Sequence, residues 1–163
     1  MSPGREAIPT WFFALVVVRR GDQFVLVHET KHGQLHSLPG GRAEPGETLA
    51  QAAMRETLEE AGIPVVLEGV LRLEHSPGSV AGPSGHDNSE DARVRALFLA
   101  RPADDTPLKR VQDEHSQRAN WVRLSELSNY PLRGEEVREL FEYVARGGAV
   151  APLSILTLEG ASW

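Results

Sequence analysis

Runs of apolar and β-branched residues predict strands in the first part of the chain. Residues 11–18 (WFFALVVV) are continuously apolar and shorter than a typical helix, so we expect a strand buried on both faces. After a polar turn at residues 19–22, residues 23–29 (QFVLVHE) predict a second strand, and the two form a hairpin. Residues 35–38 are expected to be extended, because Pro39 disfavours helix at the residue before it.

The next segment has the start and stop signals of an amphipathic helix. Thr48 is a suitable N-cap, and Gln51 completes a capping box three residues later. The helix is expected over residues 49–61, because Gly62 is a favourable C-terminal residue and Pro64 cannot continue the helix. The glutamates of the helix are expected to face away from the sheet. The apolar residues share the opposite side, which should pack on the sheet: Leu49, Ala52, Ala53 and Leu58.

The remaining pattern predicts three strands, one helix and one long loop. The strands are expected at residues 65–73, 93–100 and 120–124, followed by a helical turn at residues 125–127. Residues 135–146 carry the best helical stripe, with apolar residues at Val137, Leu140, Phe141 and Val144. Residues 75–91 are rich in Gly, Ser, Pro and Asp and lack periodicity, which is typical of a functional or disordered loop.

Composition narrows the class of protein. The chain has 163 residues with 40% hydrophobic residues, which favours a single domain over residues 1–163, with a flexible lead-in at residues 1–9. A net charge of −6 argues against stable nucleic-acid binding, which normally requires a basic face. The absence of cysteine excludes disulfides and thiolate metal sites. Without an apolar run of about 18 residues or a signal pattern, we expect no membrane association and a cytoplasmic location.

Three carboxylates crowd one side of the first helix. Glu56, Glu59 and Glu60 are three or four residues apart, or adjacent, and like charges at helical spacing cost about 0.2–0.5 kcal/mol per pair. Glu59 and Glu60 also lie in the last turn, where the helix dipole disfavours acids. A solvated acidic face is the simpler interpretation, but this arrangement favours a bound divalent cation. Oxygen ligands select a hard cation such as Mg²⁺ or Mn²⁺.

The spacing around these acids resembles the Nudix hydrolase signature. The matching positions in residues 41–63 are Gly41, Glu47, Arg55, Glu56, Glu59, Glu60 and Gly62. The resemblance implies an α/β fold, an α/β/α sandwich with a mixed β-sheet between helices. It also implies metal-dependent hydrolysis of a nucleoside diphosphate linked to another group. Thr57 replaces a larger aliphatic residue of the family pattern, and His36 replaces a tryptophan before the LPGG segment.

The resemblance assigns the metal site to the helix. Glu56, Glu59 and Glu60 would hold the metal, and the carbonyl of Gly40 would add a ligand.

The general base is left open among several acids. Glu59 and Glu60 are the candidates within the signature, and Glu114 is the candidate outside it, with Asp113 nearly as plausible. Arg55 and Glu47 are expected to pair and to orient the loop and the glutamates.

The substrate is the least determined part of the prediction. The leading hypothesis is a small-molecule nucleotide, a nucleoside di- or triphosphate, including oxidised forms. The alternatives are ADP-ribose or another nucleotide sugar, and a non-catalytic nucleotide-sensing module. Specificity should come from loops at residues 30–37 and 75–91, where His36 and His86 are candidate contacts. Arg93 and Arg95 could meet phosphate, and apolar residues 11–13 could support a homodimer.

Overall fold

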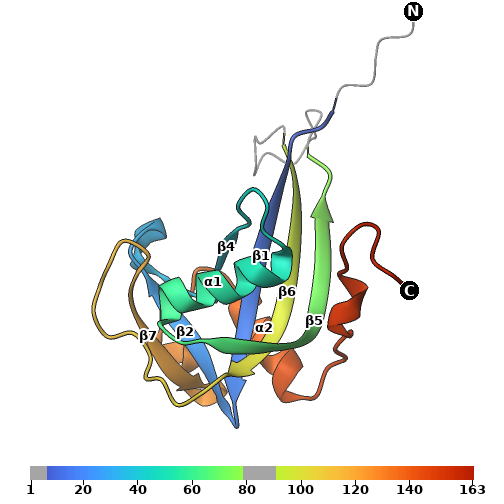
Figure 1. Cartoon of the computed structure of the whole chain (residues 1–163). Helices are drawn as coiled ribbons and strands as arrows, with labels where there is room; N and C mark the ends of the chain where they lie inside the picture. The colour runs from blue at the N-terminus through green and yellow to red at the C-terminus, as the bar shows by residue number, and fades with distance from the viewer. Residues whose placement is uncertain (1–6, 79–90) are drawn as a thin grey trace, which may run out of the picture.

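The computed structural model describes residues 7–78 and 91–163, which form a sheet with helices on both faces (Figure 1). The strands are β1 Thr10–Arg20, β2 Gln23–Glu29, β3 His36–Ser37, β4 Gly40–Arg42, β5 Val65–Ser76, β6 Ala92–Pro102 and β7 Ser116–Arg123. The α-helices are α1 Leu49–Ala61 and α2 Glu136–Ala145, and short 3₁₀ helices occur at His32–Gln34, Leu124–Asn129 and Leu153–Ile155. None of the helices in these described ranges has the length and apolarity needed to cross a membrane.

The sheet is mixed and divides after the first hairpin. Its order is β3-β2-β1-β6-β5, with β4 added to β1 and β7 added to β2. Strands β1 and β6 run parallel, whereas the other paired strands are antiparallel. The predicted hairpin is present, but β1 and β2 pair only at Arg19↔Phe24 and Arg20↔Gln23. The two strands then separate, and β4 pairs with β1 through Leu15↔Gly40 where β2 has left it.

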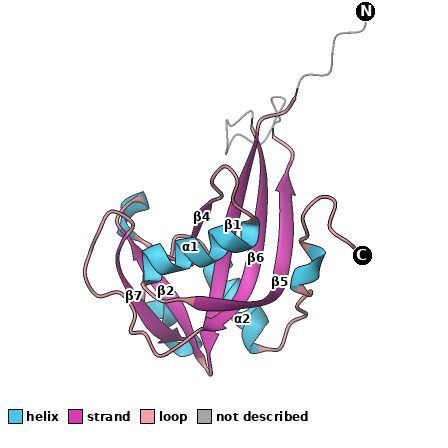
Figure 2. Cartoon of the chain, in the orientation of Figure 1, coloured by secondary structure: helices cyan, strands magenta, loops and turns pink. Residues whose placement is uncertain are grey.

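Helices lie on both faces of the sheet (Figure 2), and each face has its own core. Helix α1 covers one face, where Ala52, Ala53 and Ala61 are fully buried. Helix α2 covers the other face, where Phe141 stacks on Phe24 with 4.4 Å between ring centroids. The predicted stripe of α2 is buried along its whole length. The expected α/β/α sandwich with a mixed sheet is therefore confirmed.

The helix signals are confirmed, whereas some predicted burial is wrong. Thr48 and Gln51 form the capping box, and Gly62 is left-handed with φ 75°. Leu58 was expected in the core but is 54% exposed. The core stripe of α1 instead passes through Thr57, whose hydroxyl donates to the carbonyl of Ala53 at 2.8 Å. This bond lets a polar residue occupy the place of a larger aliphatic one.

The expected boundaries change at two further places. Trp11 and Phe12 are 43% and 45% exposed, so the first strand is buried on both faces only in its second half. Strand β5 continues to Ser76, past the expected start of the 75–91 loop. The rest of that loop, with the candidate His86, lies largely outside the described residues, as do residues 1–6 of the lead-in.

Candidate functional site

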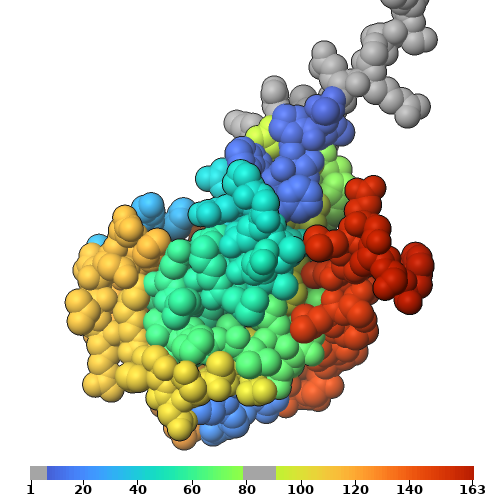
Figure 3. All heavy atoms as spheres, in the orientation of Figure 1, coloured from blue at the N-terminus to red at the C-terminus, as the bar shows by residue number. Residues whose placement is uncertain are grey.

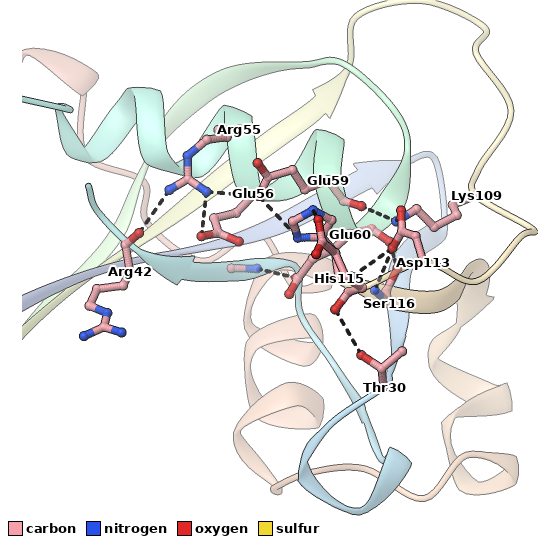
Figure 4. A network of polar contacts seen from close by, with 12 residues as sticks. Thr30, Arg42, Arg55, Glu56, Glu59, Glu60, Lys109, Asp113, His115 and Ser116 are labelled. Atoms are coloured by element: carbon pink, nitrogen blue, oxygen red, sulfur yellow. Dashed lines mark hydrogen bonds and ion pairs between the residues drawn. The ribbon is translucent and has the colours of Figure 1, made fainter. Parts of the chain in front are cut away.

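Arg55 links the loop before α1 to the glutamates of the helix, and Figure 4 shows its contacts with Glu56 and with the backbone of Arg42. Its Nε and Nη2 atoms donate to the two carboxylate oxygens of Glu47 at 2.8 and 2.9 Å. Its Nη1 atom donates to Glu56 at 2.9 Å and to Glu59 at 3.0 Å, and Nη2 also reaches the carbonyl of Arg42 at 3.0 Å. The predicted Arg55–Glu47 pair is thus present, and the same guanidinium offsets two of the crowded acids.

Glu60 lies in a different environment from the other two glutamates. Its Oε2 atom accepts the N–H of Gly40 at 2.9 Å, so its side chain points toward β4. Burial, together with the negative charges of Glu56 and Glu29, raises the pKa of Glu60 to about 8. The expectation that all three glutamates face away from the sheet is therefore wrong for Glu60. Removing this carboxyl from water disfavours its ionised form.

Burial also raises the pKa of Glu56, although the guanidinium of Arg55 opposes this shift. The two glycines of β4 leave room for the acids to come close to this strand. A Cβ atom on Gly40 would lie 2.6 Å from the carbonyl oxygen of Ala14, and one on Gly41 would lie 2.3 Å from Glu56 Oε1. Neither glycine has a positive φ, so their contribution is space and not an unusual backbone conformation.

The end of α1 is held by the segment before β7. Lys109 Nζ donates to the carbonyl of Glu59 and to Asp113 Oδ2, the latter at 2.7 Å. The hydroxyl of Ser116 donates to the carbonyl of Glu60 at 2.6 Å. These donors satisfy carbonyls of the last helical turn that have no partner within the helix.

Asp113 and Glu114 are adjacent but have different roles in this segment. The other carboxylate oxygen of Asp113 accepts the N–H groups of His115 and Ser116 at 2.9 and 3.1 Å. The hydrogen bond from Lys109 lowers the pKa of Asp113 to about 2. Both of its oxygens therefore hold the turn. The side chain of Glu114 is 86% exposed and borders a cavity, while His115 Nδ1 lies 3.7 Å from Glu59 Oε2.

A cavity of about 610 Å³ brings these acids together with basic and apolar residues. Its acidic members come from four elements or loops: Glu29, Glu60, Glu114 and Glu136. Its basic members are Lys31, Arg93, Arg95 and Arg133, and apolar contacts come from Phe13, Leu15 and Val137. Arg95 is already paired with Glu74 at 2.8 Å and with Glu136. The cavity therefore offers both a place for a cation and positive groups for an anionic ligand.

Glu29 is a residue of this site that the sequence interpretation missed. It ends β2, and its Oε1 atom pairs with Arg133 Nη1 at 3.0 Å. Its Oε2 atom is buried without a hydrogen-bond partner. An acid at the end of a buried strand, directly before a candidate specificity loop, was the signal in the sequence that could have indicated it.

These residues fit a divalent cation by their chemistry. In the ranges 7–78 and 91–163, no three His, Cys, Asp or Glu side chains already converge as a ligand set. Arg55 holds Glu56 and Glu59, and the Gly40 N–H holds Glu60. The glutamates nevertheless offer oxygen ligands, and neither Glu60 nor the Oε2 atom of Glu29 makes an ion pair with the described residues, although Lys109 acts on Glu60 from a distance and Arg133 pairs with the other oxygen of Glu29. Buried carboxylates of this kind are stabilised by coordination to a hard cation.

Comparison with known proteins identifies the family. A family model described as NUDIX domain matches residues 12–144. The chain is 34% identical over 134 residues to a Homo sapiens protein named 8-oxo-dGDP phosphatase NUDT18, covering 80% of this chain and 37% of that protein. It is 30% identical over 129 residues to the NAD-capped RNA hydrolase NudC of Escherichia coli O157:H7, covering 78% of this chain and 45% of that protein. The chain thus spans less than half the length of these curated relatives.

A solved structure agrees with the family model over almost the whole chain. The NUDIX hydrolase from Nitrosomonas europaea matches with a TM-score of 0.71 and 27% sequence identity, covering 94% of this chain and 99% of that chain. The family match includes most of β1, α1 with its glutamates, β7 and most of α2. On this evidence, the chain belongs to the Nudix family.

Proposed function

We propose that the chain hydrolyses a pyrophosphate bond in a nucleoside diphosphate linked to another group, using Mg²⁺ or Mn²⁺. The observation that supports this most is the buried Glu60, placed beside Glu56 and Glu29 in a cavity that also contains arginines. Acids alone would favour a cation site, and arginines alone an anion site. Their presence in one cavity favours a ligand that carries phosphate and binds together with a metal.

The metal ligands that we propose are the carboxylates of Glu56, Glu59 and Glu60, with the carbonyl of Gly40. When bound, the cation supplies positive charge to the phosphate oxygens and activates water. Arg55 would then act as a positioning residue, because its guanidinium already fixes the carboxylates of Glu56 and Glu59.

For the general base we retain Glu59, Glu60 and Glu114. Glu114 is favoured over its neighbour Asp113, because both carboxylate oxygens of Asp113 already accept hydrogen bonds within the turn. Glu114 borders the cavity with a carboxylate that lies 3.5 Å from His115 Nε2 but is 86% exposed, so water can reach it to give up a proton.

The first substrate class to test is nucleoside di- and triphosphates, including oxidised ones, because a relative with 34% identity is named an 8-oxo-dGDP phosphatase. ADP-ribose and other nucleotide sugars form the alternative class. Purified protein should be assayed with Mg²⁺ or Mn²⁺ on 8-oxo-dGDP, 8-oxo-dGTP, unmodified nucleotides and ADP-ribose, with identification of each product.

We expect cleavage of at least one nucleotide, with turnover lowered about 100-fold or more by Glu60→Gln, since metal-held charge stabilisation is commonly worth that much. Arg72→Gln is a matched control, because Arg72 is exposed on β5 outside the cavity. Binding of nucleotides without cleavage of any would instead support the sensing module. Equal turnover by Glu60→Gln and the unaltered chain would contradict the metal role.

We also propose that residues 1–163 form one domain, act in the cytoplasm on small molecules without stable nucleic-acid binding, and associate as a homodimer. The exposed Trp11 and Phe12 support the homodimer, because exposed aromatic residues are enriched at interfaces. Sedimentation velocity of the unaltered chain and of a Trp11→Ser, Phe12→Ser variant tests this. A monomer at all concentrations would refute it.

A further inference from the structure

A second cavity, also of about 610 Å³, lies away from the acidic site and shares none of its lining residues. It is bordered by Arg20, by the segment 105–110 and by residues 118–121 of β7. In Figure 3 the yellow segment after β6 lies beside the blue turn between β1 and β2. Its volume falls in the range of about 300–1,000 Å³ that is usual for small-molecule pockets.

The charge of this cavity is opposite to that of the chain. Its lining contains one acidic residue, Asp105, and four basic residues: Arg20, Lys109, Arg110 and Arg118. The whole chain has a net charge of −6, so a positive cavity is not a consequence of its overall composition. Lys109 is already paired with Asp113, so the positive charge of the lining comes mainly from its three arginines. A concave surface in which one sign of charge predominates concentrates the field and attracts ligands of the other sign.

Two of the arginines are available to an anion. The guanidinium carbon of Arg20 lies 4.2 Å from the ring centroid of Trp121, and Arg20 Nη2 donates to Gln23 at 3.3 Å. These contacts limit the rotamers of Arg20, so little additional entropy is lost when it binds a ligand. Arg110 is exposed and makes no ion pair or hydrogen bond with the residues that the structure describes.

The backbone of β7 contributes a further donor. β7 pairs with β2 on one edge, and on its other edge the N–H of Ala119 donates to the carbonyl of Lys109 at 3.0 Å. Alternate residues of an antiparallel strand direct their N–H groups to the same edge. The N–H of Trp121 therefore points to the edge that borders the cavity, where it adds to the positive potential.

We propose that this second cavity binds a phosphate-bearing small molecule of mononucleotide size, with Arg20 and Arg110 as its main phosphate contacts. The wall of the cavity includes Lys109, which also holds the end of α1 through the carbonyl of Glu59. A ligand here would therefore border the segment that supports the acidic site without entering that site.

Fluorescence of Trp121 gives a readout specific to the second cavity. The chain has three tryptophans, so Trp11→Phe and Trp163→Phe leave Trp121 as the only one. Inorganic tripolyphosphate is a suitable probe, because it carries the phosphate charge and does not absorb at the wavelengths of tryptophan. Titration in EDTA removes divalent cations and so weakens any contribution of the acidic site.

We expect a saturable change in Trp121 fluorescence that weakens with added salt. Arg110→Glu in the same background should weaken the affinity about tenfold or more, since it replaces an attractive contact with a repulsive one. The control Arg72→Glu, on an exposed side chain of β5, should bind as the background does. Nucleotide hydrolysis by Arg110→Glu in the natural background should equal that of the unaltered chain, so failure here is distinct from failure of the proposed function.

Three outcomes would overturn the proposal. The first is no change in Trp121 fluorescence at millimolar tripolyphosphate, and the second is equal affinity of Arg110→Glu and its background. The third is tighter binding of single-stranded oligonucleotides than of tripolyphosphate, with affinity that increases with oligonucleotide length. That result would assign the surface to nucleic acid and not to a small molecule.

Discussion

The pair of Arg55 and Glu47 should be coupled more strongly than an ordinary surface ion pair. The perturbation is a double-mutant cycle of Arg55→Ala, Glu47→Ala and the double variant, which isolates the energy of this one contact. The two side chains meet through two parallel hydrogen bonds and are only 25% and 14% exposed. This geometry is the bidentate form in which a guanidinium and a carboxylate interact best.

The expected coupling energy is about 1–2 kcal/mol. Two unit charges about 4 Å apart attract by roughly 4 kcal/mol at an effective dielectric constant near 20. Desolvation of both groups and about 2 kcal/mol of arginine rotamer entropy oppose this attraction. The remainder exceeds the 0.2–1 kcal/mol that is usual for exposed pairs. Arg55 also contacts Glu56 and Glu59, so the single substitution Arg55→Ala should cost more than the coupling energy alone.

Urea unfolding of the four proteins in EDTA measures the coupling without a contribution from bound metal. The pair of Arg72 and Glu74 is the matched control, with a single 3.3 Å contact and side chains that are 59% and 27% exposed. Its coupling should be below about 0.5 kcal/mol. A value equally small for Arg55 and Glu47 would refute the reasoning, because the contact would then not hold the loop to α1.

Three further predictions concern the pH dependence of stability, the room beside Gly41 and stabilisation by a metal ion. Burial lowers the pKa of His36 below its ordinary value of 6.5, so the contribution of neutral His36 to stability is fully present above pH 6.5 and is lost as pH falls through the folded-state pKa. The urea midpoint should therefore fall less between pH 7.5 and 5.5 in His36→Phe than in the unaltered chain, and an equal fall in both proteins would contradict this. Gly41→Ala should lower kcat/KM about 100-fold with unchanged circular dichroism, because the added Cβ would displace the carboxylate of Glu56. Normal activity of this variant would show that hydrolysis does not require the Glu56 carboxylate beside Gly41. Mn²⁺ at about 100 times its Kd should stabilise the folded protein by some 2.7 kcal/mol and so raise Tm by about 5–10 °C. An equal rise of Tm in Glu60→Gln would exclude Glu60 as a metal ligand.

Local patterns predicted the elements of the fold better than the burial of individual residues. The cap at Thr48 and the stop at Gly62 depend on a few neighbouring residues, and both were confirmed. The burial of Trp11, Phe12 and Leu58 depends on which residues of other elements cover them, and the sequence does not contain that information. The left-handed backbone of His32 and Gln34 was likewise hidden, because neither residue type signals a positive φ.

The same distinction applies to the site. The contact between Arg55 and Glu59 follows from helical spacing, and the contact with Glu47 follows from a short loop. The contact between Glu29 and Arg133 joins residues 104 positions apart, and no local pattern predicts it. The arginines of β6 enter the cavity because β6 pairs with β1 in parallel, which is also a property of the assembled sheet.

Positive groups of the chain already offset part of the acidic charge of α1. The crowded acids of α1 first indicated that a positive charge was absent, yet the chain itself provides two. Arg55 pairs with Glu56 and Glu59, and Lys109 binds a carbonyl of the last helical turn. Glu60 remains without an ion pair: its only hydrogen-bond donor in the described structure is a backbone N–H, and Lys109 acts on it only through its more distant charge.

Glu60 and the unpartnered oxygen of Glu29 therefore support the cation site more strongly than the number of acids does. A solvated acidic face would leave its carboxyl groups exposed to water, where their pKa values stay ordinary. Burial instead raises the pKa of Glu60 to about 8, and Glu29 adds negative charge from a different strand. Arg133 offsets one oxygen of Glu29, whereas Glu60 has no ion pair in the described structure and the Oε2 atom of Glu29 has no hydrogen bond. A divalent cation shared with phosphate is a ligand that fits both of these groups and the arginines of the cavity.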